Sequence, residues 1–335
     1  MATNRVRRQS RIVVSPLTCL MLVLVIAAPP ALAQARGAGA SGRQQVLFVG
    51  PGRELTLPSE AARVARDGAL VEIVAGDYEG DVAVWRQNDL TLRGVGRRPH
   101  LRAGGMAAEG KAIWVIKGDR VVVENLEFSG ARVLSHNGAG IRAEGVGLTI
   151  RNCRFHHNEM GLLTNPRPDS IIIIEDSELD HNITETARHG RLGHNIYVHR
   201  ASRFVLRNSD VHGAQVGHQV KTRATRNEIR DNRIRDGDGA SSYLLDISEG
   251  GQAEVTGNRF EQGRRAENRT AIAFAAEARN RSSDRHSLKV EGNEFVNEGS
   301  AATFVRNHSS TPVQLKGNRI PLRWVTPLRG AGDVN

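Results

Sequence analysis

Eight short segments of similar sequence recur along the chain and constrain its fold more than any other feature. Each alternates apolar and polar residues with period two, reaches an Asn, Asp or Gly, and then shows another apolar residue. The turn positions follow one another at steps of about 23 to 35 residues, which is the period of a solenoid coil. The pattern predicts stacked parallel β-coils. The turn residues are Asn125, Asn152, Asp176, Asn208, Asp231, Gly257, Gly292 and Gly317.

The position after each turn carries a second signal. It is Leu126 and Cys153 in the first two repeats, then serine twice, then asparagine four times in succession, at Asn232, Asn258, Asn293 and Asn318. Stacked asparagines can hydrogen-bond to one another and to turn backbone inside a coil, so we expect an internal ladder. Cys153 lies in the same column and is expected to pack in the core.

The ends of the repeat region set the predicted domain boundaries. Residues 55–80 read as a cap: Ser59 can N-cap a short helix whose apolar stripe includes Ala61, Ala62 and Val64. We expect a signal peptide at 1–33, a flexible linker at 34–45, one β-helix domain at 46–320 and a C-terminal tail at 321–335. With 35 glycines and 4% aromatic residues, the core is expected to be aliphatic.

The first residues indicate export. Four arginines precede an apolar run from Leu17 to Ala28, and Ala31-Leu32-Ala33 is a small-x-small cleavage site. We therefore expect a periplasmic or secreted protein with no membrane span after cleavage. The formal net charge is +10, and removal of the four arginines in the predicted signal peptide leaves +6, which favours an anionic partner such as a uronic-acid polysaccharide. Nucleic acid is not the expected partner in that compartment.

The candidate site lies between Gly193 and Asp246. Two Gly-His segments, GHNIYVHR and GHQVKTRA, lie one repeat apart, and SSYLLDIS follows one repeat later. If they stack as neighbouring strands, one outward face carries two rows of side chains from these segments, with His194 and His218 at the strand starts. Asp246 joins this face beside Lys221 if Leu245 stacks inward on Val220. The two rows are Asn195, Tyr197 and His199, and Gln219, Lys221 and Arg223.

These segments also carry a resemblance. The capping helix followed by VEIVAGDYEG, and the coils that end in NRF or NEF, resemble right-handed parallel β-helix proteins of the pectate-lyase-like superfamily. The stretch GHNIYV…GHQVKTRA looks like an uncharacterised bacterial subgroup of these exported proteins. The resemblance implies an all-β, right-handed parallel β-helix with a short capping helix. It also implies action on acidic polysaccharides by lyases, hydrolases, esterases or epimerases, among which the fold alone does not choose.

Residue chemistry favours β-elimination. Inverting hydrolysis needs a set of carboxylates, but Asp210 stands alone on the coil before Gly217-His218-Gln219. Lys221 and Arg223 are two residues apart on a strand, so they share a face about 6–7 Å apart and can neutralise a uronate carboxylate. Lys221, with its pKa lowered by cationic neighbours, or His218 is the predicted base, and Tyr197 the predicted acid.

The remaining predictions concern binding and alternatives. Residues His194, Asn195, Gln219 and Asp246 are predicted to bind substrate. No metal ligands are assigned, although acidic turn residues such as Glu175 and Asp176 leave Ca²⁺ open as a cofactor. A non-catalytic carbohydrate-binding or envelope protein, or a hydrolase or epimerase on the same fold, remains the alternative to a lyase.

Overall fold

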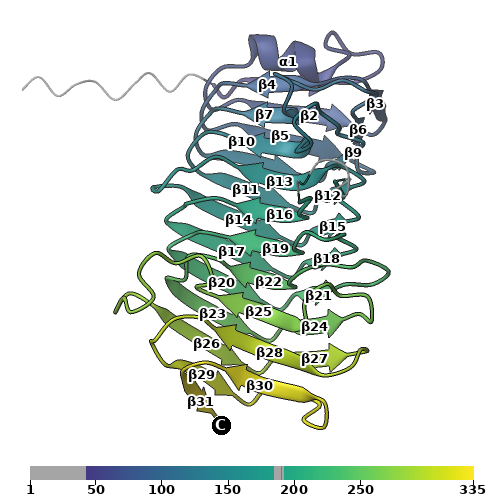
Figure 1. Ribbon diagram of the computed structural model, residues 1–335. Helices are drawn as coiled ribbons and strands as arrows, with labels where there is room; N and C mark the ends of the chain where they lie inside the picture. The colour runs from purple at the N-terminus through teal and green to yellow at the C-terminus, as the bar shows by residue number, and fades with distance from the viewer. Residues whose placement is uncertain (1–42, 185–189, 191) are drawn as a thin grey trace, which may run out of the picture. The chain divides into compact units, whose positions relative to one another are not determined.

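The computed structural model describes residues 43–184, 190 and 192–335. The predicted signal peptide and most of the predicted linker lie outside this range. From Gln44 to the C-terminus the chain winds as successive coils, and each full coil contributes one strand to each of three parallel sheets (Figure 1). This is the predicted all-β parallel β-helix. Within the described residues, no helix has the length and apolar character needed to cross a membrane.

Three sheets form the walls of the solenoid, and every pair of neighbouring strands in them is parallel. The described part of the 12-stranded sheet consists of β1 (Val46–Val49), β2 (Leu70–Val74), β5 (Thr91–Val95), β8 (Val121–Glu124), β11 (Leu148–Arg151), β14 (Ile171–Glu175), β17 (Arg203–Arg207), β20 (Arg226–Arg230), β23 (Gln252–Thr256), β26 (Ser287–Glu291), β29 (Val313–Lys316) and β31 (Gly332–Val334). The described part of the 9-stranded sheet consists of β3 (Asp77–Glu79), β6 (His100–Arg102), β9 (Glu127–Ser129), β12 (Arg154–His156), β15 (Glu178–Asp180), β18 (Asp210–His212), β21 (Arg233–Arg235), β24 (Arg259–Gln262) and β27 (Glu294–Asn297). The described part of the 10-stranded sheet consists of β4 (Ala83–Trp85), β7 (Ala112–Ile116), β10 (Ala139–Ala143), β13 (Met160–Thr164), β16 (Ile196–Val198), β19 (Val220–Thr222), β22 (Leu245–Ile247), β25 (Thr270–Phe274), β28 (Ala302–Asn307) and β30 (Val325–Arg329).

The turn between the 12-stranded and 9-stranded sheets is a single residue in the left-handed conformation. All eight predicted turn residues have φ between +49° and +68°. Asparagine, aspartate and glycine tolerate this region best, which explains why the repeats place them there. The predicted turns are confirmed.

The predicted asparagine ladder is also present. The Asn232 Nδ2 donates to Asn258 Oδ1 at 2.9 Å, and the same bond joins Asn258 to Asn293 at 3.0 Å and Asn293 to Asn318 at 2.9 Å. Cys153 lies in this column with no exposed surface, as predicted. Burial raises the pKa of its thiol to about 12, so it is an unreactive core residue.

The core is more aromatic than composition suggested. Although aromatic residues are few, most phenylalanines and two tryptophans are fully buried and stack from coil to coil, as Phe128 does on Phe155 at 5.0 Å. Coil stacking brings equivalent inward positions together, so a few rings placed there form a continuous column. The expectation of a purely aliphatic core is therefore wrong.

Helix α1 (Pro58–Val64) covers the N-terminal end of the solenoid beyond β4 (Figure 1). The helix begins after Leu57, and the Glu60 carboxylate accepts hydrogen bonds from the backbone N–H groups of Thr56 and Leu57. Ser59 is therefore not the N-cap; its N–H donates to Asp81. Ala61 and Ala62 are buried as expected, but Val64 is exposed.

The solenoid continues beyond Ile320. Strand β30 pairs with β28, and β31 pairs with β29, so residues 325–334 extend two of the sheets. The segment predicted as a tail thus contributes the last strands.

Candidate functional site

Part of the predicted face on the 10-stranded sheet is present, namely the row through Tyr197, Lys221 and Asp246. In the ladder of β16, β19 and β22, Tyr197 pairs with Lys221, and Lys221 pairs with Asp246. Their neighbours Val220 and Leu245 have no exposed surface and fix the register, because a slip of one residue would turn them outward. The register predicted from Leu245 and Val220 is confirmed.

Five side chains make what we call the Lys221 cluster: Tyr197, Lys221, Arg223, Asp246 and Glu277. The Lys221 Nζ donates to Asp246 Oδ2 at 3.0 Å and to Glu277 Oε1 at 2.6 Å. The other Glu277 oxygen accepts from Arg223 Nη2. One carboxylate therefore bridges two cations, and the cluster holds two positive and two negative side chains.

The pKa of Lys221 differs from the prediction. Burial favours the neutral amine, but the carboxylates of Asp246 and Glu277 outweigh it, so the pKa of Lys221 is raised rather than lowered. Partial burial likewise opposes ionisation of Glu277, but Lys221 and Arg223 hold its pKa below the usual range. Lys221 is thus a cation at neutral pH, which suits charge neutralisation and does not suit the predicted role of base.

Tyr197 lies half-buried beside these cations. The Lys221 Nζ is 5.8 Å and the Arg223 Cζ 5.5 Å from the centre of its ring, distances at which a cation is attracted to the ring face. Its ring is also 5.6 Å from the His199 ring. Burial raises the pKa of the Tyr197 phenol although both cations act in the other direction. The hydroxyl is therefore protonated at neutral pH, as an acid must be.

The two histidines lie beneath this surface. His194 and His218 are each 5% exposed, and their rings stack at 5.0 Å, with Tyr243 stacked next at 5.1 Å. The His218 Nδ1 accepts the backbone N–H of Tyr243 at 3.1 Å, so its proton is on Nε2, which lies 3.4 Å from Asp246 Oδ2. Burial and the nearby Lys221 charge lower the pKa of His218 to about 3. A neutral ring whose lone pair is already engaged is poorly placed to act as a base.

Asn195 and Gln219 do not face outward as predicted; both have no exposed surface. The Asn182 Nδ2 donates to Asn195 Oδ1 at 2.8 Å, and Asn195 Nδ2 donates to Gln219 Oε1 at 2.6 Å. They belong to a second internal amide ladder, at the corner where the chain enters the 10-stranded sheet. A side chain without exposed surface cannot contact a polysaccharide, so their placement as substrate-binding residues is wrong.

Two features were not predicted from the sequence: Glu277, and a large hollow elsewhere on the solenoid. Glu277 follows β25 in an irregular segment, two coils after Lys221, where no repeat pattern gives its position. A hollow of about 1090 Å³ lies several coils nearer the N-terminus than the Lys221 cluster, and its lining includes Arg132, His136, His157 and Glu159. A smaller hollow of about 270 Å³ reaches Arg223 itself. We take the Lys221 cluster as the candidate site, because two cations and two carboxylates converge there on an outward strand face.

Metal-ligating groups gather elsewhere. Two trios with donor atoms within 4.8 Å of one another lie on the 9-stranded sheet: His100, Glu127 and His156, and Glu178, Asp180 and His212. Glu175, one of the acids considered for Ca²⁺, is buried and paired with Arg151 and Arg207.

Two solved structures and one family model are similar to this chain. An alginate lyase from Paenibacillus sp. str. FPU-7 superposes with a TM-score of 0.49 at 13% identity, over 82% of this chain and 94% of that chain. A pectin methylesterase from Aspergillus niger superposes with a TM-score of 0.44 at 11% identity, over 88% of this chain and 93% of that one. No curated protein matches the sequence. Residues 105–320 match the family described as right handed beta helix region, and the chain therefore belongs to that family.

Proposed function

We propose that the protein is an exported, polysaccharide-active enzyme that cleaves a uronic-acid glycan by β-elimination at the Lys221 cluster. The observation that carries the proposal is the Glu277 carboxylate, held at once by the Lys221 ammonium at 2.6 Å and by the Arg223 guanidinium. Two strand-borne cations that grip one carboxylate are the groups needed to bind and neutralise a uronate.

The free cluster is formally neutral, so a substrate carboxylate must take the place of Glu277. Glu277 lies on an irregular segment, and its side chain is 42% exposed, whereas the side chain of Lys221 is 9% exposed and fixed on β19. Once displaced, Glu277 loses the two charges that hold its pKa down, and it becomes a stronger base. We assign to Glu277 the removal of the proton at C5 of the uronate.

Each bond broken in the elimination is matched by a bond formed. The electron pair of the C5–H bond forms the C4–C5 double bond, the C4–O bond breaks, and the leaving oxygen takes a proton. We assign to Tyr197 the transfer of a proton to that oxygen, because its hydroxyl is protonated and its ring lies beside both cations. Lys221 and Arg223 stabilise the negative charge that develops on the carboxylate during the reaction.

The test is incubation of the protein with a panel of uronate polymers, followed by ultraviolet absorbance of the unsaturated product. Glu277→Gln should tighten the binding of uronate oligosaccharides, because it frees the two cations, and should abolish turnover. Tyr197→Phe should keep binding and lose turnover. Glu249→Gln is the matched control, because Glu249 pairs with Arg200 outside the cluster and its removal frees a cation there. Absence of unsaturated product on every polymer would refute the lyase proposal.

A hydrolase is the second candidate. Asp246 and Glu277 both contact the same Lys221 nitrogen, so their oxygens lie within about 6 Å, near the carboxylate separation of retaining glycosidases. Asp246 is only 2% exposed, which weighs against direct contact with a glycosidic oxygen. Release of reducing ends without unsaturated product would favour this second candidate. Binding without cleavage would indicate a carbohydrate-binding protein.

A further inference from the structure

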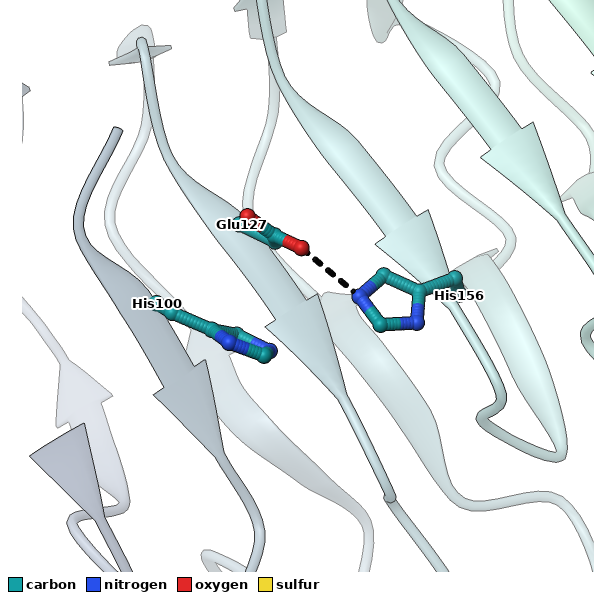
Figure 2. A group of neighbouring side chains, drawn as sticks. All are labelled: His100, Glu127 and His156. Carbon is teal, nitrogen blue, oxygen red and sulfur yellow. Dashed lines mark hydrogen bonds and ion pairs between the residues drawn. The ribbon is translucent and has the colours of Figure 1, made fainter. Parts of the chain in front are cut away.

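The outward face of the 9-stranded sheet brings together two imidazoles and a carboxylate from three consecutive coils. His100 is on β6, Glu127 on β9 and His156 on β12, and their side chains converge above the middle strand (Figure 2). In the strand register, His100 lies opposite Glu127, whereas His156 lies opposite Ser129. Ser129 is two residues beyond Glu127 on the same strand and the same face. One donor atom from each residue lies within 4.8 Å of the other two.

This donor set suits a transition metal. Two histidines and one glutamate are the three protein ligands of open zinc sites, in which water occupies the fourth position. Ligands around a tetrahedral Zn²⁺ lie about 3.3 Å apart, so the donors need to approach one another by at most about 1.5 Å. The His156 Nε2 and Glu127 Oε1 are already 2.8 Å apart. The three side chains are 13%, 21% and 15% exposed, so an ion with a bound water can reach them.

Groups around the trio can orient the ligands. The His156 Nδ1 lies 2.8 Å from the His157 Nδ1, a partner for the nitrogen that does not bind metal. The His100 Nδ1 lies 3.6 Å from Asp77 Oδ1, and ligating histidines commonly direct their second nitrogen to a carboxylate. Without metal, Arg102 donates to His100 Nδ1 at 3.1 Å, and His100 Nε2 lies 2.8 Å from Ser129 Oγ. Metal binding through Nε2 therefore requires the proton to move to Nδ1 and Arg102 to turn to the same Asp77 oxygen, 3.4 Å away.

An arginine explains why the acidic side chains of the second trio on this face lie close together. The Arg154 guanidinium donates to both oxygens of Asp180, at 3.2 and 3.3 Å, and lies 3.3 Å from Glu178. An arginine therefore already supplies the positive charge that a metal would bring. Among residues 43–184, 190 and 192–335, no lysine or arginine lies within ion-pair distance of the Glu127 carboxylate.

We propose that His100, Glu127 and His156 bind one divalent transition-metal ion, with Zn²⁺ as the reference ion. The site is distinct from the Lys221 cluster, which is on another sheet. A metal here links three coils at the N-terminal half of the solenoid. Binding to the folded chain alone should also stabilise it against unfolding.

The experiment is calorimetric titration of the metal-free protein with Zn²⁺, with the visible absorption of Co²⁺ as a second readout. We expect one tight site per chain. Glu127→Gln and His156→Gln should weaken it by at least about 100-fold, more than loss of an outer partner typically does. His212→Gln is the matched control, since it removes a histidine of the second trio, and it should leave the tight site unchanged.

Thermal unfolding with and without Zn²⁺ separates loss of the site from loss of the fold. The wild type should unfold at higher temperature with Zn²⁺, and Glu127→Gln should keep its circular dichroism and lose that increase. Weak binding at several sites, a tight site unaffected by Glu127→Gln, or equal loss in His212→Gln would overturn the proposal.

Discussion

Replacing Lys221 with methionine should destabilise the solenoid through the charge that it leaves behind. Asp246 is 2% exposed, and its Oδ2 accepts from Lys221 at 3.0 Å and from Ser248 at 2.6 Å. Without Lys221, Asp246 keeps the Ser248 bond and the neutral His218 Nε2–H, 3.4 Å from its Oδ2, but no cation. Removing one partner of a buried pair costs about 3–5 kcal/mol, so we expect a loss of that size in the free energy of unfolding at pH 7.

The double variant Lys221→Met/Asp246→Leu separates this cost from loss of packing. It removes both charges and keeps apolar volume, so most of the lost stability should return. In the single variant, protonation of Asp246 in the folded state removes the unpaired buried charge, and burial already raises the pKa of Asp246. The folded variant then binds a proton that the unfolded chain releases, so the stability that Lys221→Met loses relative to the wild type should shrink as the pH falls from neutral.

Urea unfolding followed by far-ultraviolet circular dichroism, at neutral and mildly acidic pH, measures these differences. Arg203→Met is the control, because Arg203 pairs with Glu228 at 2.6 Å in an exposed position and should lose no more than about 1 kcal/mol. Equal destabilisation of the single and double variants would refute the reasoning, since it would mean that the buried charge of Asp246 carries no cost.

Three further predictions test the interior. His218 has a folded pKa of about 3 against 6.5 when unfolded, so only the unfolded chain gains its proton between those values. Stability should therefore fall by about 5 kcal/mol as the pH drops through that window, and His218→Phe should reduce this dependence in acid unfolding curves. Asn258→Ala removes four buried hydrogen bonds of the Asn258 side chain and should cost about 3–5 kcal/mol in urea unfolding, while Asn318→Ala at the ladder end should cost less. The Cys153 thiol should not react with a disulfide reagent until denaturant is added, and rapid labelling of the native protein would contradict its burial.

The fold could be predicted because the repeats encode it twice. Period-two alternation identifies the strands, and a residue tolerant of positive φ marks the turn, as at Asn125 and Gly257. The same logic placed Lys221 beside Tyr197 and Asp246, because apolar residues such as Val220 flank it on a short strand and determine its face. Local sequence is sufficient wherever both neighbours of a residue are core residues.

The prediction failed where the chain turns a corner. The outward direction predicted for Asn195 extends the strand alternation to a residue that precedes β16. The backbone bends at that residue, and its amide side chain points inward. The pKa of Lys221 depends on Glu277, which comes from a segment without repeats. The metal-ligating trio depends on the pairing of three strands, and His156 is offset by two residues from the row of His100. Such contacts are set by register and loop path, which one sequence does not reveal.

The Lys221 cluster combines fixed cations with a counter-ion on an irregular segment. Lys221 is held by a strand whose flanking residues, Val220 and Thr222, have no exposed surface, and the amide ladder through Gln219 anchors the start of that strand. Glu277 lies outside any strand and reaches the cations across two coils. The carboxylate ligand that we propose would therefore compete with Glu277 alone, and its affinity would depend on how strongly that one side chain is bound. Neutralising Glu277 is expected to change ligand affinity without moving the cations, which a buried counter-ion such as Asp246 could not permit.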